Sequence, residues 1–221
     1  MQATLSAQRR GSKPSQKHWQ TPCRPPSRAR QSTTGSGGPE VATGDTVLVT
    51  GGSGFVAGWV IAEALNAGYP VRATMRTVGR DAQVRDAVSR VSDHVDQLSF
   101  VNAELGADDG WADAVEGCRY VLHVASPFPP TQPKDPDELI VPARDGAIRV
   151  VGAALDAGVE RIVLTSSIAS IDFASGESHD RKLTPEDWTD GDSPRFSPYA
   201  RSKALAEKAA WELARERGMP E

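Results

Sequence analysis

The chain has 221 residues, of which 38% are hydrophobic and 24% charged, with a net charge of −4. This composition fits one sizeable globular domain, and no apolar stretch approaches the ~20 residues of a membrane helix. Residues 1–40 hold seven Lys and Arg against one acid, which leaves 18 basic and 28 acidic residues in 41–221. An acidic globular part argues against nucleic acid as the main partner.

Two cysteines and four histidines are scattered through the chain. They show neither metal-ligand spacing nor a disulfide framework, so we expect no metal site. Sparse cysteine use fits a reducing compartment, and we expect a cytoplasmic protein with no membrane partner. Cys118 precedes an apolar run and is predicted to be an ordinary buried thiol.

Residues 1–43 form a basic segment rich in Ser, Pro and Arg that almost lacks large apolar residues. Such a segment cannot bury enough surface to offset its chain entropy, so we predict a disordered extension. Its acid-poor composition also resembles an organellar transit peptide, but Pro14, Pro22, Pro25 and Pro26 oppose the amphipathic helix that this requires. An unremarkable tail, or a start site assigned too far upstream, is favoured over targeting.

From Thr46 onward, short β-branched runs alternate with helical patterns, which predicts an α/β fold with a doubly wound parallel sheet over residues 44–221. The predicted strands cover 46–50, 71–75, 98–102, 120–124 and 161–165. The predicted helices cover 55–67, 82–90, 109–115, 137–157 and 199–217. Three of these helices are followed by glycines that act as stop signals, Gly68, Gly158 and Gly218.

Ligands of parallel sheets bind at the carboxyl ends of the strands, where strand order reverses. Residues suited to binding or catalysis follow each of the five predicted strands in turn, at 51–54, Arg76, Glu104, 125–127 and 166–167. Right-handed crossovers make consecutive strands neighbours, so these five loops are expected to converge on one edge of the sheet.

A glycine-rich turn, residues 51–54, lies between the first predicted strand and the helix that begins near Phe55. Gly51 and Gly54 allow the backbone to turn tightly and to approach a pyrophosphate, whose charge the helix N-terminus would meet. Ala57 stands where a third glycine often occurs, and alanine is small enough for close packing of helix on strand. The turn predicts a dinucleotide site.

The second predicted strand is followed by Arg76. An acid at this place would bind the ribose 2′-hydroxyl and repel a 2′-phosphate, whereas an arginine does the opposite. Arg76 therefore favours NADP, with NAD left as the alternative.

Tyr199 and Lys203 stand four residues apart in the last predicted helix. Positions i and i+4 share one helix face, so both side chains are expected to point into the same cleft. A phenol titrates near ~10 in water and transfers protons at neutral pH only where a nearby ammonium stabilises its anion. Ser167 would polarise a substrate carbonyl and orient it toward Tyr199. The alternative is an exposed helix whose tyrosine and lysine are ordinary surface residues.

Five motifs together carry a family resemblance: residues 50–55 (TGGSGF), 71–76 (VRATMR), 123–127 (HVASP), 165–167 (TSS) and 199–208 (YARSKALAEK). They resemble an extended short-chain dehydrogenase/reductase of the NAD-dependent epimerase/dehydratase superfamily. The chain is most similar to the group of dihydroflavonol 4-reductases, cinnamoyl-CoA reductases and yeast-type aldehyde reductases. The resemblance implies a Rossmann-type domain whose C-terminal substrate lobe is largely missing, because the chain stops where a sixth strand would begin.

The resemblance also assigns roles by position. It implies that Ser167, Tyr199 and Lys203 are the catalytic residues. The residues that it assigns to the cofactor, besides Tyr199 and Lys203, are Gly51, Gly54, Phe55, Val56, Arg76, Glu104, Leu105, Ala125, Ser126, Thr165 and Ser166. Glu104 departs from the aspartate that the family usually has beside the adenine.

The implied function is that of an NADP-dependent oxidoreductase that transfers hydride between nicotinamide and a small ketone, an aldehyde or a secondary alcohol. Two alternatives stay open: a non-catalytic NADP-binding fragment or interaction module, and a nucleotide-sugar epimerase or dehydratase. The expected partner is a small carbonyl or alcohol substrate. The helix that begins at Tyr199 often forms a dimer face in such enzymes, which leaves a homodimer open.

Overall fold

The computed structural model describes residues 45–77, 79–129, 131, 133–171, 182–184 and 186–219. The predicted disordered extension over 1–43 lies outside these described residues. So does the last residue, Glu221, at the end of the predicted domain over 44–221.

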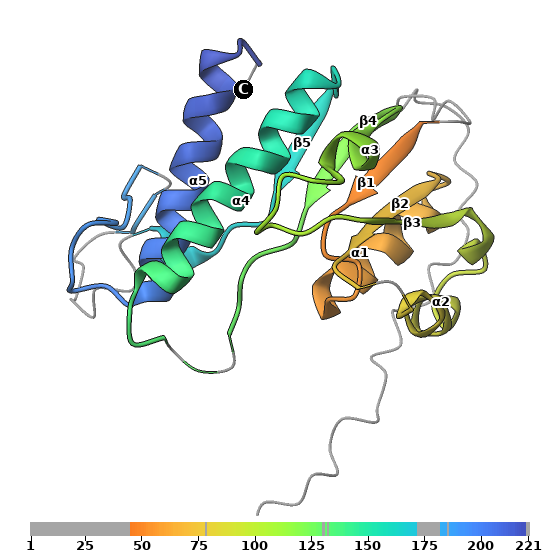
Figure 1. Cartoon of the computed structure of the whole chain (residues 1–221), viewed down its shortest axis with the longest axis horizontal. Coiled ribbons are helices and arrows are strands. Elements are labelled where there is room, and N and C mark those ends of the chain that lie inside the picture. Colours follow the sequence, from red (N-terminus) through yellow and green to blue (C-terminus); the bar gives the residue numbers. More distant parts are fainter. Residues whose placement is uncertain are drawn as a thin grey trace, which may run out of the picture. The chain divides into compact units, whose positions relative to one another are not determined.

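Five parallel strands form one sheet in the order β3-β2-β1-β4-β5 (Figure 1). The strands are β1 (Thr46–Val49), β2 (Val71–Met75), β3 (Leu98–Asn102), β4 (Cys118–His123) and β5 (Arg161–Leu164). Consecutive strands are neighbours, as predicted, with the exception of β3 and β4. These two are separated by β2 and β1, so the strand order reverses at β1, where the carboxyl ends of β1 and β4 diverge.

The helices are α1 (Phe55–Asn66), α2 (Asp81–Ser89), α3 (Trp111–Val115), α4 (Asp137–Asp156) and α5 (Pro198–Glu216). Two short 3-10 turns, η1 (Val95–Gln97) and η2 (Ile168–Ser170), were not predicted. Each predicted strand and helix boundary lies within two residues of the observed one. The glycines predicted to end helices, Gly68, Gly158 and Gly218, all have positive φ.

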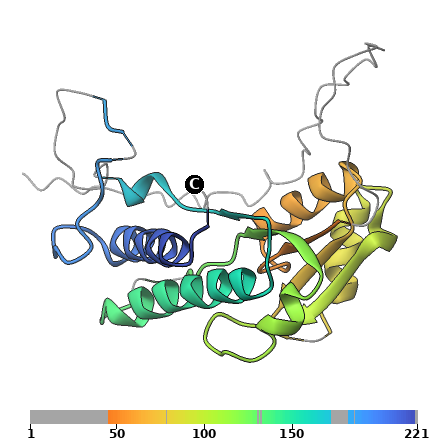
Figure 2. The same cartoon turned by 90° about the horizontal axis from the view of Figure 1, so that it is seen from above.

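Helices cover both faces of the sheet, and Figure 2 shows α1 and α4 on opposite sides of it. Val47 and Val49 of β1 are buried with α1 and α2, whereas Leu48 between them is buried with α3 and α4. This alternation follows from the two-residue period of a strand, and a strand that is covered on both faces has to be apolar throughout. The doubly wound α/β fold predicted from the sequence is confirmed.

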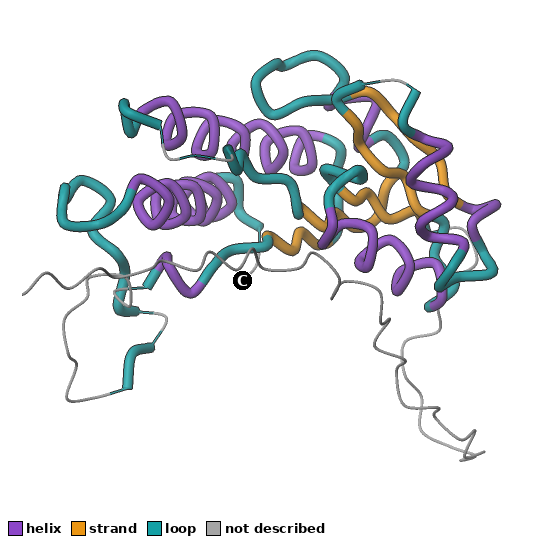
Figure 3. Tube along the Cα trace, turned by 90° about the horizontal axis from the view of Figure 1, so that it is seen from below, coloured by secondary structure: helices purple, strands orange, loops and turns teal. Residues whose placement is uncertain are grey.

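The last helix, α5, lies alongside α4 rather than directly on the sheet (Figure 3). The contact is made by small side chains, Ala143 and Ala147 of α4 with Ala206 of α5. Alanines let two helix backbones approach closely, which keeps α5 at a defined distance from the strand ends. At the far end of the pair, Arg217 donates to Asp156 at a distance of 2.5 Å.

The fifth strand is an edge of the sheet, since it pairs with β4 and has no second neighbour among the described residues. Its Val163 is 52% exposed. Cys118 of β4 is buried, and burial raises the pKa of its thiol, as expected of an ordinary buried cysteine. Among the described helices, none is both long and apolar enough to cross a membrane.

Candidate active site

The carboxyl ends of the strands and the first turns of α5 enclose a cavity of about 1100 Å³. All of the predicted cofactor residues line it: Gly51, Gly54, Phe55, Val56, Arg76, Glu104, Leu105, Ala125, Ser126, Thr165, Ser166, Tyr199 and Lys203. The structure thus brings together residues that are up to 152 positions apart in the chain. Of the predicted catalytic residues, Ser167 does not line the cavity.

The glycine-rich turn is hydrogen-bonded to β2. The Gly51 N–H donates to Thr74 Oγ1 at 2.9 Å, and the Gly52 N–H donates to the Thr74 carbonyl at 2.8 Å. Gly51 has a φ of 72°, and a Cβ there would lie 3.1 Å from the Cβ of Ala125. Only glycine combines this backbone conformation with so close an approach to the end of β4.

The N-terminus of α1 opens on the same cavity. No side chain caps it, and its first turn carries no acid. The first helical bond runs from the Gly58 N–H to the Gly54 carbonyl, so within the described residues the amides of Phe55, Val56 and Ala57 have no acceptor. The side chain of Phe55 is 82% exposed. Free amides at an uncapped helix end fit an anionic group such as a pyrophosphate.

Thr50, the residue before the glycine turn, joins the ends of β1 and β4. Its Oγ1 accepts the N–H groups of Val124 at 3.0 Å and Ala125 at 2.9 Å, which occupies both lone pairs. The hydroxyl hydrogen therefore goes to His123 Nδ1, 2.8 Å away. It follows that neutral His123 carries its proton on Nε2.

His123 is buried beside the cavity, and this burial, with the charge of Lys203 adding to it, lowers the pKa of the imidazole to about 4. The ring is neutral at physiological pH. It puts no second positive charge next to the lysine.

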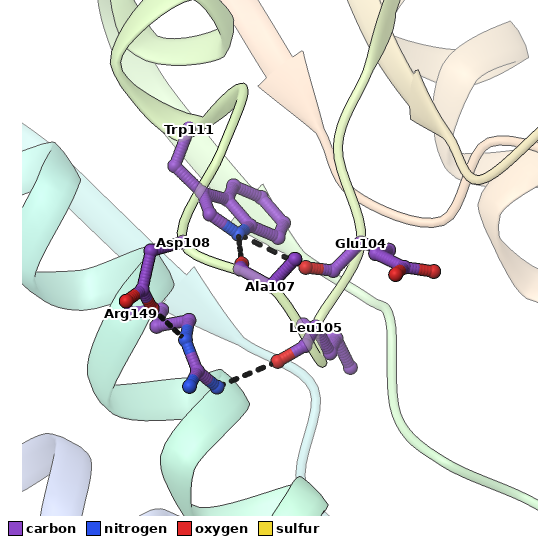
Figure 4. Close-up of polar contacts among 6 residues, drawn as sticks. All are labelled: Glu104, Leu105, Ala107, Asp108, Trp111 and Arg149. Carbon is purple, nitrogen blue, oxygen red and sulfur yellow. Dashed lines mark hydrogen bonds and ion pairs between the residues drawn. The ribbon is translucent and has the colours of Figure 1, made fainter.

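A loop after β3, residues 104–108, is held from two sides (Figure 4). The Trp111 indole N–H donates to the carbonyls of Glu104 at 3.1 Å and Ala107 at 3.0 Å. Arg149 of α4 donates to the Leu105 carbonyl at 2.8 Å and pairs with Asp108. This loop supplies the cavity wall formed by Glu104 and Leu105. Its shape is therefore set by side chains outside it.

Leu105 fits against α4 at a glycine. A Cβ on Gly146 would lie 2.8 Å from the Cβ of Leu105, so a larger residue there would displace this wall of the cavity. Sequence reasoning missed Gly146, Trp111 and Arg149, because none of them belongs to a motif.

The beginning of α5 presents Tyr199 and Lys203. Ser197 caps the helix by accepting the Ala200 N–H at 3.2 Å, and Pro198 occupies its first turn. Both of these side chains are partly buried and line the cavity. The ring of Phe128 packs edge-on against Tyr199 with centroids 5.7 Å apart. Phe128 follows the 123–127 motif directly, and nothing in the sequence marks it.

Lys203 reaches back toward β5, where its Nζ lies 3.5 Å from the Thr165 carbonyl oxygen. Burial lowers the pKa of its ammonium, and the charge of Glu207, one helical turn further on, opposes that shift. Ser167 begins the η2 turn, and its Oγ accepts the Ala169 N–H at 3.2 Å. The structure therefore places Ser167 next to the cavity-lining Ser166 and leaves its hydroxyl engaged in the turn.

Arg76 is exposed at the rim of the cavity and forms no ion pair within the described part of the chain. Its guanidinium is available to an anionic ligand. A second cavity, of about 440 Å³, lies between α1 and the edge of the sheet near Val163, and no predicted site residue lines it.

Comparison with known proteins agrees with this architecture. The chain is 40% identical over 185 residues to dihydroflavonol 4-reductase of Zea mays, covering 79% of this chain and 50% of that protein. It is 33% identical to cinnamoyl-CoA reductase 1 of Arabidopsis thaliana, with 80% and 50% covered. The chain thus spans about half the length of the curated relatives it matches.

Solved structures have the same fold. Yeast methylglyoxal/isovaleraldehyde reductase Gre2 complexed with NADPH superposes with a TM-score of 0.67 at 27% identity, covering 77% of this chain and 53% of that one. Vestitone reductase from alfalfa (Medicago sativa) gives 0.62 at 31% identity, with 79% and 54% covered. Residues 47–220 match the model of the NAD dependent epimerase/dehydratase family. The chain belongs to this family.

Proposed function

We propose that this chain carries the cofactor site and the proton-transfer residues of an NADP-dependent oxidoreductase. Its substrate would be a small ketone, an aldehyde or the corresponding alcohol. The observation that carries the proposal is the shared cavity, which is lined by the glycine turn at one end and by Tyr199 and Lys203 at the other. A cofactor of dinucleotide length needs both ends.

Different groups of residues would bind the different parts of the cofactor. The amides of Phe55, Val56 and Ala57 would bind the pyrophosphate, and Arg76 the 2′-phosphate. The loop with Glu104 and Leu105 would form the adenine side of the site. The backbone of Ala125 and the carbonyl of Thr165 would face the nicotinamide half. Bound NADP would supply the hydride chemistry at nicotinamide C4.

The protein's own contribution is the movement of a proton. In the reducing direction, Tyr199 Oη would donate its proton to the oxygen of the substrate carbonyl as that oxygen becomes an alcohol. The ammonium of Lys203 would stabilise the resulting phenolate. Ser167 would orient the substrate oxygen once its hydroxyl turns from the Ala169 amide to the substrate.

The preference for NADP rests on Arg76 and on the absence of an acid among the cavity residues at the end of β2. The relative Gre2 has NADPH bound in its solved structure. Arg76 also makes a nucleotide-sugar epimerase the weaker candidate, because such epimerases usually retain NAD.

The test is NADPH oxidation by the purified chain with a panel of small aldehydes and ketones, run beside Tyr199→Phe. Turnover that falls by at least about a hundredfold in the variant, while NADPH binding is retained, supports the proposal. Equal turnover of the two proteins contradicts it. NADPH binding without turnover of any carbonyl favours the non-catalytic module instead.

A further inference from the structure

We propose that Glu207 is a positioning residue of this site: its carboxylate fixes the turn that carries Ser167, and its charge acts on Lys203. This inference rests on the proposed function, since it concerns how the proposed catalytic residues are held. Neither the motif analysis nor the family comparison assigns Glu207 a role.

The helix geometry puts three functional side chains in a row. Tyr199, Lys203 and Glu207 follow one another at intervals of four residues on α5 and therefore share one face of the helix. The first two line the cavity, and Glu207, which is partly buried, stands one helical turn beyond Lys203.

A hydrogen bond joins Glu207 to the end of β5. The Ser166 hydroxyl donates to the Glu207 carboxylate. Ser166 Oγ also lies 3.3 Å from Ser170 Oγ, but it has one hydrogen to give, and the carboxylate is the stronger acceptor. Ser166 is thereby held in an orientation that depends on a charged group of another element.

The turn beyond Ser166 is closed by its own hydrogen bonds. The Ser170 hydroxyl donates to the Ser167 carbonyl at 2.8 Å, and the Ala169 N–H donates to Ser167 Oγ at 3.2 Å. Ser170 is buried. The turn behaves as one unit, and the bond from Ser166 to Glu207 fastens this unit to α5. Ser167 and Tyr199 are therefore held at a fixed separation.

Charge is the second part of the argument. Burial lowers the pKa of Lys203, and the Glu207 carboxylate partly restores it. The other titratable groups near Lys203 are Tyr199 on α5 and the neutral His123 on β4. Arg76, Glu104 and Glu138 also line the cavity. The carboxylate whose charge raises the pKa of Lys203 is that of Glu207, one helical turn away on α5.

Two variants separate the two effects. Glu207→Gln keeps an oxygen that accepts the Ser166 hydroxyl and removes the charge, whereas Ser166→Ala removes the hydrogen bond and keeps the charge. Glu212→Gln, at an exposed position of the same helix, is the matched control. Thermal unfolding of each protein shows that the variants are folded before they are compared.

The primary readout is the titration of Lys203 in the ligand-free chain of residues 1–221, followed by NMR of protein labelled with ¹³C in its lysine side chains. The chain has six lysines, and Lys203→Arg identifies the signal. We expect Glu207→Gln to lower the titration midpoint by about one pH unit. Ser166→Ala and Glu212→Gln should leave it unchanged. An identical Lys203 midpoint in Glu207→Gln and Glu212→Gln overturns the proposal.

Kinetics provide the second readout. The basic limb of the pH profile of kcat should move to lower pH in Glu207→Gln by the same amount as the midpoint. In Ser166→Ala, kcat should fall about tenfold at every pH, because Ser167 is then less well held. A profile that keeps its shape in Glu207→Gln contradicts the proposal. Failure of the proposed function itself is recognised separately, as loss of NADPH binding or turnover in the unsubstituted chain.

Discussion

The hydroxyl of Thr50 and the imidazole of His123, 73 residues apart in the chain, lie 2.8 Å apart at the ends of the neighbouring strands β1 and β4. This bond fixes the tautomer of the histidine. Together with the two amides that Thr50 accepts, it also fixes the distance between the glycine turn and the loop after β4. The two halves of the cavity are joined at this point.

Thr50→Val tests this junction, because valine has the same shape and offers no hydrogen bond. It leaves the amides of Val124 and Ala125 and the Nδ1 of His123 without their partner in a buried place. We expect the free energy of unfolding to fall by about 2–4 kcal/mol, measured by urea denaturation. The exposed Thr77→Val is the control. If Thr50→Val lowers the free energy of unfolding no more than Thr77→Val does, Thr50 does not join the ends of β1 and β4 in the way described.

His123 predicts how stability depends on pH. Its pKa is about 4 in the folded protein and ~6.5 when unfolded, so between these values the unfolded state binds more protons. Its contribution to stability is complete above ~6.5 and is lost as the pH falls toward 4, by about 3 kcal/mol in total.

His123→Asn, which keeps an acceptor for Thr50, should remove this part of the pH dependence. The exposed His94→Asn should leave it in place. Urea denaturation at pH 4.5, 5.5 and 7 measures the effect. Parallel curves for His123→Asn and the unsubstituted chain would show that His123 is not the group responsible.

Arg149→Met tests whether the contacts of Arg149 hold the loop of residues 104–108 in a conformation that binds NADPH. The variant loses the bond to the Leu105 carbonyl and the ion pair with Asp108. We expect the Kd for NADPH to rise about fivefold, which corresponds to ~1 kcal/mol. Fluorescence titration measures it. Arg144→Met, on the same helix and paired only with its neighbour Asp145 among the described residues, should bind as the unsubstituted chain does. Equal affinities for the two variants would exclude a role for the loop.

Arg76→Ala tests the choice of cofactor. Loss of a guanidinium beside a 2′-phosphate removes a charge-assisted bond, so the Kd for NADPH should rise about 10- to 100-fold while the Kd for NADH changes little. Arg80→Ala serves as the control, since Arg80 does not line the cavity and bonds to Gln83. An equal loss of affinity for NADPH and NADH would mean that Arg76 does not bind the 2′-phosphate.

Local patterns were sufficient to predict the strands and α-helices of this fold. Runs such as Ile162-Val163-Leu164 and the glycines after the helices are properties of short segments, and their boundaries hold within two residues. The separation of β3 from β4 by two other strands is a property of the whole sheet, and the consecutive arrangement predicted for them was wrong.

The residues that shape the site were less accessible to sequence reasoning. Trp111 and Arg149 act by donating to backbone carbonyls of a loop. Every residue has such a carbonyl, so residue types do not predict which ones accept these hydrogen bonds. The bond from Ser166 to Glu207 spans 41 residues. Thr50 and His123 each belong to a motif, but their pairing depends on the register between β1 and β4. By contrast, residue type and local spacing were sufficient to predict that Tyr199 and Lys203 face one cleft, and both line the cavity together with Gly51.

A crystal structure of the chain with NADP⁺ tests the central proposal most directly. The account predicts the pyrophosphate against the amides of residues 55–57 and the nicotinamide ring beside Tyr199 and Lys203. A cofactor bound with its nicotinamide away from Tyr199, or a chain that binds neither NADP⁺ nor NAD⁺ in a titration, would contradict it.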